Sequence, residues 1–127
     1  MTTKDIGDIG EKAAAKLLKK SGYKIKERNI HLSHNEIDIV AEDKQFVVFV
    51  EVKTRTKAMD GDSLYGVPSS AVDSRKRERL IRAAIDYMKL KPTNKQPRMD
   101  VIEVWLDGAH KVVQTNHIEN AYGTKGY

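Results

Sequence analysis

Three charged residues stand where a buried β-strand would carry apolar side chains. Glu51 and Lys53 end the segment 46–53, the most hydrophobic stretch of the chain, and Asp38 belongs to a second alternating segment, separated from Glu51 by twelve residues. Because side chains alternate along a strand, Glu51 and Lys53 share one face. Two carboxylates and an ammonium group gathered on that face could bind a metal ion and act on a phosphate ester.

The length of the loop between these two segments decides how the carboxylates meet. Segments joined by so short a polar link predict a hairpin. With a two-residue loop Asp38 pairs with Phe49 and lies diagonal to Glu51, whereas with a four-residue loop Asp38 lies directly opposite Glu51. Both registers put the three charged residues on one face, with the carboxylate β-carbons about 5–8 Å apart. A shift by one residue would separate them and invert the apolar pattern.

The chemistry of this set favours phosphodiester hydrolysis. Converging carboxylates repel each other unless a cation joins them or one of them stays protonated. Oxygen ligands without His or Cys suit a hard ion such as Mg²⁺ or Mn²⁺. Lys53 could assist a nucleophile or neutralise developing negative charge. The competing interpretation is a solvated strand end at which Glu51 and Lys53 only pair with their neighbours.

Two residues on predicted helices flank this set. Residues 1–22 predict an amphipathic helix, with Glu11 at the margin of its apolar stripe and away from its lysines. Glu11 either points toward the sheet or is an ordinary helix-flank residue. Residues 70–90 predict a second helix with Lys76 on the inward face, where a lysine needs a partner or a ligand. Its outward face carries a stripe that either binds phosphates or is simply solvated: Arg75, Arg79, Arg82 and Lys89.

The remaining segments complete an alternating α/β pattern. Strands are predicted at residues 23–32, 36–40, 46–53, 99–106 and 111–114, around the two helices. The order α-β-β-β-α-β-β predicts one α/β domain over residues 1–127, with a mixed central β-sheet flanked by helices. Residues 1–5 and 121–127 are expected to fray.

Composition excludes several classes of protein. The chain has 127 residues, a net charge of +5 and no cysteine. It therefore has no disulfides, thiolate zinc sites, iron–sulfur clusters or catalytic thiols. No apolar run approaches the roughly 20 residues of a membrane span, and the N-terminus lacks the apolar segment of a signal peptide. The expected location is the cytoplasm.

A series of short motifs stands in a specific order and spacing between residues 7 and about 122. They are Gly10-Glu11 with the alanine-rich helix, Gly22-Tyr23, Arg28-Asn29, Glu36-Ile37-Asp38-Ile39, Phe49-Val50-Glu51-Val52-Lys53-Thr54-Arg55, Lys76 and Arg98-Met99-Asp100-Val101. In these motifs the chain resembles the YraN-like family of small bacterial proteins. That family has a restriction-endonuclease-like fold and is similar to archaeal Holliday-junction resolvases. Asn35 stands where the family usually has glycine.

The resemblance implies the D…E-x-K core of this nuclease superfamily. Asp38 and Glu51 would be the ligands of Mg²⁺ or Mn²⁺, together with the backbone carbonyl of Val52. Lys53 would be the catalytic lysine, and Glu11 the acidic residue that the first helix places near the metal. Lys76 and an ion pair between Arg98 and Asp100 are expected near the site.

These expectations describe a metal-dependent endonuclease acting on branched or otherwise structured DNA. Arg55, Lys57, Lys76 and Arg77 would hold the DNA backbone without reading its sequence. Similarity to junction resolvases implies a homodimer, because a symmetric junction offers two equivalent phosphates. Two alternatives stay open: a nucleic-acid-binding module of the same fold without turnover, and an interaction subunit of a repair or transport complex.

Overall fold

The computed structural model describes residues 2–32, 34–56 and 74–123. Its elements, in chain order, are α1 (Thr3–Lys20), β1 (Lys24–Leu32), β2 (Asn35–Glu42), β3 (Phe46–Thr56), α2 (Ser74–Leu90), β4 (Gln96–Leu106) and β5 (Val112–Tyr122). The predicted order α-β-β-β-α-β-β is therefore confirmed. Neither helix in these ranges is long and apolar enough to cross a membrane.

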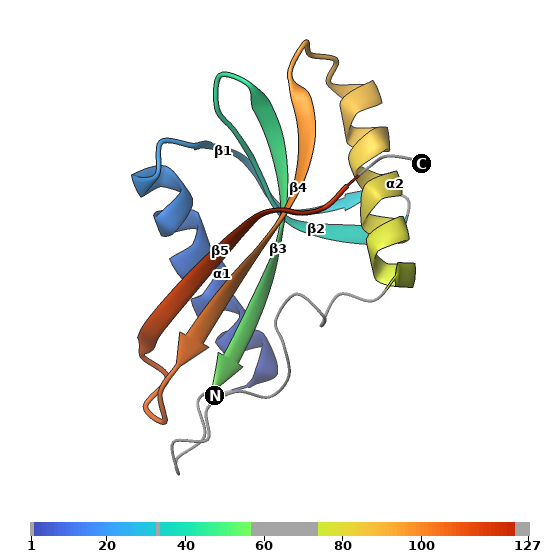
Figure 1. Ribbon diagram of the computed structural model, residues 1–127. Helices are drawn as coiled ribbons and strands as arrows, with labels where there is room; N and C mark the ends of the chain where they lie inside the picture. Colours follow the sequence, from blue (N-terminus) through green and yellow to red (C-terminus); the bar gives the residue numbers. More distant parts are fainter. Residues whose placement is uncertain (1, 33, 57–73, 124–127) are drawn as a thin grey trace.

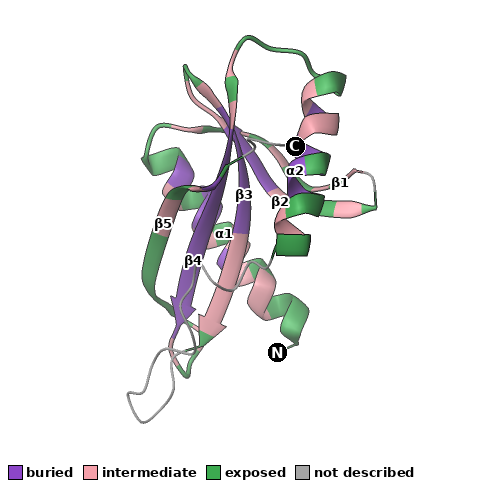
Figure 2. Cartoon of the chain, turned by 45° about the vertical axis from the view of Figure 1, so that its right-hand side comes forward, coloured by how far each residue is buried: buried purple, intermediate pink, exposed green. Residues whose placement is uncertain are grey.

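The five strands form one mixed sheet that the helices cover on both faces. The strand order is β1-β2-β3-β4-β5, with β3 and β4 parallel and the other neighbours antiparallel. Helices α1 and α2 lie on opposite sides of it (Figure 1). Val48 and Val50 pack in the cluster that contains Leu18 of α1, whereas Val47 and Phe49 pack against α2. The first half of β3 is therefore apolar on both faces, and the central strands are mostly buried (Figure 2).

The sheet divides into two arms halfway along β2 and β3. The β2–β3 ladder ends at the pair Ile39–Val50, while β2 stays paired with β1 as far as Leu32–Asn35. Strand β3 continues along β4 to the pair Thr56–Leu106. Figure 1 shows β1 and β2 turning away from β3, β4 and β5. We call the place where β2 leaves β3, at Asp38 and Glu51, the fork.

Helix α1 approaches β3 closely at one glycine. A Cβ atom added to Gly10 would lie 1.8 Å from Thr54 Oγ1, much closer than any van der Waals contact. Only glycine therefore allows the helix to sit this close to the strand. This contact fixes the depth of the following residue, Glu11, on the α1 side of the sheet.

Several elements are longer than the sequence predicts. Strand β3 extends to Thr56, β4 begins at Gln96 and includes Pro97, and β5 runs to Tyr122 instead of ending at residue 114. Strand β5 is an edge strand whose side chains are mostly exposed and polar, so it lacks the apolar signal of the inner strands.

The structure describes part of each end that is expected to fray. Residues 3–5 belong to α1, because Thr2 and Asp5 form a capping box at its start. Residues 121 and 122 belong to β5, and the Tyr122 side chain is buried. Residues 70–73, the predicted start of the second helix, lie outside the described residues.

Candidate metal and phosphate site

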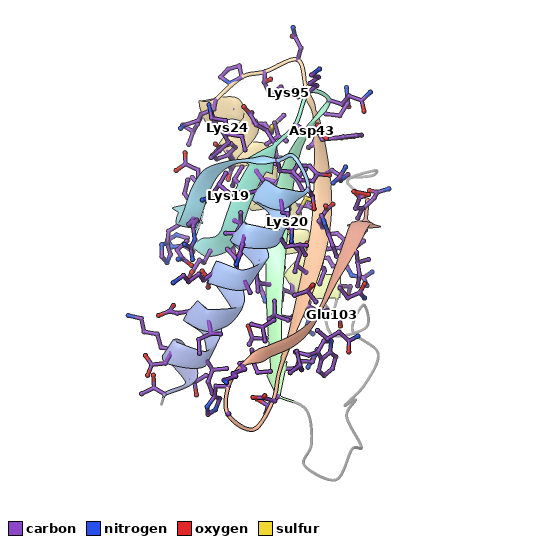
Figure 3. All side chains as sticks on the ribbon, turned by 90° about the vertical axis from the view of Figure 1, so that its left-hand side faces the viewer. Lys19, Lys20, Lys24, Asp43, Lys95 and Glu103 are labelled. Atoms are coloured by element: carbon purple, nitrogen blue, oxygen red, sulfur yellow. The ribbon has the colours of Figure 1, made fainter. Side chains whose placement is uncertain are left out.

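The β2–β3 turn selects one of the two predicted registers. The pair Ile39–Val50 places Asp38 directly across from Glu51, as the four-residue loop predicts. Asp43 closes this loop: its backbone N–H donates to the Phe46 carbonyl at 3.1 Å, and its Oδ1 accepts the N–H groups of Gln45 and Phe46 at 2.8 and 2.7 Å. Figure 3 labels Asp43 in this turn. A side chain in the loop thus sets the position of Asp38.

The main chain of β3 holds the Asp38 carboxylate at the fork. The N–H of Val52 donates to Asp38 Oδ2 over 2.9 Å, beyond the last ladder pair of β2 and β3. The N–H and C=O of one residue point to the same side of an extended strand, as paired strands require. The Val52 carbonyl is therefore directed toward the β2 side of β3, as the predicted ligand set requires.

Burial makes the charge on Asp38 costly. Removal from water is the largest cause that raises its pKa, to about 6, and the hydrogen bond from Val52 opposes it. The negative charges of Glu11, Glu51 and Glu36 raise it further. Burial also raises the pKa of Glu11, although Asn29 hydrogen-bonds to that carboxylate. The fork therefore gathers carboxylates from α1, β2 and β3 in a place of low solvation.

Two lysines share one oxygen of Glu51. The Glu51 side chain is only 6% exposed, and its Oε1 lies 2.7 Å from Lys53 Nζ and also contacts Lys76 Nζ. Burial lowers the pKa of Lys76, but the hydrogen bond and the charge of Glu51 outweigh burial and raise it. The inward position predicted for Lys76 is thus explained by a partner on β3. Glu51 Oε2 is buried and has no hydrogen-bond partner among the described residues.

The donors at the fork fit a hydrated divalent cation. Glu51 Oε2 and Glu11 Oε1 are buried carboxylate oxygens without hydrogen-bond partners in the described ranges, and such atoms are costly. Asp38, Glu51 and the Val52 carbonyl offer oxygen only, which suits Mg²⁺ or Mn²⁺. No cluster of three or more Asp, Glu or His side chains in the described part of the chain could hold a metal. Mg²⁺ usually keeps several waters beside one or two carboxylates, so this small ligand set is sufficient.

A hollow of about 330 Å³ opens at the fork. It lies between α2 and β2. The side chains of the two predicted metal ligands Asp38 and Glu51 line it. Its lining consists of His34, Asn35, Glu36, Asp38, Val50, Glu51, Lys76, Arg79 and Leu80. The hollow therefore combines carboxylates on the sheet with cations on α2, an arrangement that can receive an anionic group through a bridging cation.

The predicted DNA-binding residues do not all lie at the hollow. Lys76 reaches the hollow, whereas the guanidinium of Arg77 lies 5.5 Å from the centre of the Tyr122 ring and packs there. Arg55 is half-buried near the end of β3 and does not line the hollow. Lys57 lies outside the described residues. Arg79 lines the hollow although the helical wheel puts it on the outward stripe; its three-residue spacing from Lys76 was the available signal.

A second buried ionic group lies beside the fork on β4. Arg98 donates to both carboxylate oxygens of Asp100, from Nε at 2.9 Å and from Nη2 at 2.8 Å. Asp100 also accepts the N–H of Asn120 at 2.9 Å, and His117 Nε2 lies 2.7 Å from its Oδ2. The expected ion pair is therefore present, and His117 is a partner that sequence reasoning missed.

Comparison with known proteins identifies relatives along almost the whole chain. The model described as "Uncharacterised protein family UPF0102" matches residues 10–104. A UPF0102 protein of Caldanaerobacter subterraneus subsp. tengcongensis is 42% identical over 121 residues, covering 94% of this chain and 95% of the relative. A UPF0102 protein of Moorella thermoacetica is 42% identical over 123 residues, covering 96% and 98%. One from Clostridium botulinum (strain Loch Maree) is 42% identical over 121 residues, covering 94% of each chain.

Proposed function

The chain belongs to the UPF0102 family, and from this premise we propose that its fork is the active site of a cytoplasmic, Mg²⁺- or Mn²⁺-dependent endonuclease. The proposed substrate is branched or otherwise structured DNA. The membership agrees with the resemblance to the YraN-like family. The nuclease activity is part of the proposal. One observation carries the proposal: half-buried Asp38 and buried Glu51 face each other at the fork, with Glu51 Oε2 unpartnered among the described residues and lysines beside Oε1.

Each residue of the fork has a distinct task in this proposal. Asp38, Glu51 and the Val52 carbonyl would hold the divalent cation, which when bound polarises a phosphate and makes water a better nucleophile. Lys53 stands beside Glu51 and can orient the nucleophile or neutralise charge that develops on the phosphate. Glu11 adds negative charge near Asp38 and so favours cation binding.

Lys76 can hold a non-bridging phosphate oxygen from the α2 side of the hollow. Its ammonium group contacts Glu51 Oε1 and lines the hollow together with Arg79. A phosphate that enters would accept hydrogen bonds from these cations, which compensates for its lost hydration. Positioning of this kind supplies much of the catalysis of phosphoryl transfer.

One observation favours the second candidate, a nucleic-acid-binding module without turnover. Lys53 and Lys76 both contact the same oxygen of Glu51, so two ammonium groups already balance much of the carboxylate charge at the fork. A fork neutralised in this way could contribute to DNA binding through its cations alone. The two functions differ in whether a divalent ion is needed.

A cleavage assay separates the two candidates. Labelled four-way junction, flap and single-stranded DNA are incubated with the protein and Mg²⁺ or Mn²⁺. We expect cleavage by the wild type and a loss of about 10²–10⁴-fold in Lys53→Ala, the range typical of a lost acid–base or charge-stabilising group. Glu51→Gln should lose activity to a similar degree. Binding without cleavage by the wild type and both variants would support the binding module instead.

The homodimer remains part of this proposal. Two-fold symmetry would present two forks to the two equivalent phosphates of a symmetric junction. Sedimentation of the protein with and without a four-way junction should show two chains per junction. One chain per junction, combined with cleavage of flaps only, would replace junctions by flaps as the substrate.

A further inference from the structure

Most of the net charge of the chain is concentrated in α2. The helix carries six basic and two acidic residues, a net +4 out of +5 for the whole chain. Its first turn contains Arg75, Lys76 and Arg77 and no acidic residue. Helix dipoles favour the opposite arrangement, with acidic side chains at the N-terminus. Helix stability therefore does not explain these cations. Lys76 and Arg77 contact Glu51 and Tyr122, so the exposed arginines of the helix are the candidates for binding an anion.

A second hollow continues the first one along α2. It has a volume of about 250 Å³ and is lined by Asn35, Arg75, Glu78, Arg79 and Arg82. Asn35 and Arg79 line both hollows, so the two adjoin. With three arginines and one glutamate, the second hollow favours an anionic ligand. A ligand with its reacting group at the fork can therefore extend along the helix without a break.

The three arginines of this second hollow form an ordered row, which we call the α2 arginine row: Arg75, Arg79 and Arg82. Their spacing of four and three residues places them on one face of the helix. They are exposed, and none of the ion pairs in the described part of the chain involves them. The row spans about 10 Å along the axis. One strand of duplex DNA carries about three phosphates over that length.

We propose that the nucleic-acid strand entering the fork continues along α2, with the α2 arginine row binding successive phosphates on one side of the scissile phosphate. This inference rests on the proposed function and adds the direction of the strand and its binding residues. A guanidinium group fits phosphate oxygens through paired hydrogen bonds, which suits a repeated anion better than a single one. A mononucleotide or free phosphate would occupy the first hollow only.

The test removes two charges from the row and two from a matched helix face. Arg75→Gln/Arg82→Gln changes the two residues of the row that line only the second hollow, and Lys12→Gln/Lys16→Gln changes exposed residues of α1 on the opposite side of the sheet. Fluorescence anisotropy measures the Kd for labelled duplex and junction DNA in EDTA at several salt concentrations. The row variant should raise Kd at least tenfold, and its log Kd against log salt slope should fall by about 1.8 for the two lost contacts. The α1 variant should change Kd less than twofold.

Three results would overturn the strand path. Equal losses in the two double variants would mean that only net charge matters, and no loss in the row variant would place the DNA elsewhere. If poly-glutamate binds as tightly as DNA and loses the same affinity in the row variant, the row is a docking surface for an acidic protein. Circular dichroism of both variants confirms that the helices are intact, since glutamine is a good helix former.

Cleavage kinetics distinguish a failure of the strand path from a failure of the proposed nuclease. With a correct path, the row variant raises KM while kcat changes little, because the lost contacts are made in both ground and transition states. If Lys53→Ala abolishes cleavage while the row variant keeps both constants, the path is wrong and the nuclease stands. If the row variant loses DNA binding but the wild type never cleaves, the strand path along α2 is supported and the proposed nuclease activity is wrong.

Discussion

Two aspartates of one sheet, one buried and one half-buried, differ in how their charge is accommodated. Asp100 is fully buried, yet hydrogen bonds from His117, Arg98 and the Asn120 N–H outweigh the effect of burial and lower its pKa. Asp38 accepts one hydrogen bond from Val52, and burial raises its pKa to about 6. The ionised form of aspartate is therefore stabilised by its neighbours on β4, whereas on β2 it is disfavoured. The first arrangement holds the fold together, and the second favours a ligand that supplies the missing charge.

The same contrast extends to the cations in the two places. Arg98 is enclosed by the ring of Phe46 at 4.8 Å and that of Tyr23 at 5.5 Å, and it is fixed by Asp100. Lys53 and Lys76 instead meet on a single oxygen of Glu51, at the edge of an open hollow. A phosphate or a metal can replace these lysine contacts, whereas a ligand could reach Arg98 only by displacing its contacts with Asp100, Phe46 and Tyr23.

The largest expected effect is at the buried ion pair between Arg98 and Asp100 on β4. Asp100→Ala leaves the buried Arg98 without its main partner, so the free energy of unfolding should fall by about 3–5 kcal/mol. Urea denaturation measures this change. Glu119→Gln is the matched control, because Glu119 lies 3.4 Å from Arg98 but is mostly exposed, and it should cost less than about 1 kcal/mol. Similar values for the two variants would remove the distinction between a structural and a functional carboxylate.

A smaller effect is expected where α1 meets β3. Gly10→Ala forces the helix away from Thr54 and should lower the free energy of unfolding by about 1–3 kcal/mol. Gly7→Ala in the same helix has open space around its Cβ and should raise stability by up to about 1 kcal/mol. Thermal denaturation of the two variants measures both signs. A stable Gly10→Ala protein would show that α1 can sit farther from the sheet.

At the fork the expected change has the opposite sign. Asp38→Asn removes a half-buried charge while its amide oxygen can still accept the Val52 N–H, so the metal-free protein should gain about 1–3 kcal/mol of unfolding free energy. Urea denaturation in EDTA at pH 7 measures the gain. A loss of stability would mean that the Asp38 charge is already balanced without a ligand.

The pH dependence of stability sharpens this comparison between the two aspartates. The pKa of Asp38 is raised from 3.8 to about 6, so its folded state binds the proton more tightly. Wild-type stability should therefore fall relative to Asp38→Asn as pH rises from about 4 to 6, by up to about 3 kcal/mol. The pKa of Asp100 is lowered, so its contribution should be lost only as pH falls below about 4. A pH-independent difference between wild type and Asp38→Asn would contradict the first part.

Local patterns were enough to predict the central features of the site. Alternation along β3 places Glu51 and Lys53 on one face, and the short hairpin brings Asp38 to that face. The choice between two registers could not be made, because it depends on Asp43 closing the loop with its own side chain. The inward orientation of Lys76 followed from the helical wheel, but its partner Glu51 comes from another element.

Long-range contacts account for what the sequence did not reveal. His117 reaches Asp100 because β5 pairs with β4 in the register Ile102–His117, and that strand is too polar to be recognised over its full length. Arg79 lies on the outward stripe of α2, yet the first residues of β2, which are not paired with β3, lie beside α2 and close a hollow with Arg79. Neither fact is encoded in the periodicity of one element.

Paramagnetic titration with Mn²⁺ tests the central claim most directly. In ¹H–¹⁵N spectra of the wild type, sub-stoichiometric Mn²⁺ should broaden the amide signals of Asp38, Glu51 and Val52 before any others, because the proposed cation lies between these residues. The same titration of Asp38→Asn should need a much higher Mn²⁺ concentration. Broadening that begins elsewhere, for example at Asp60 and Asp62, and is unchanged in Asp38→Asn would contradict a metal site at the fork.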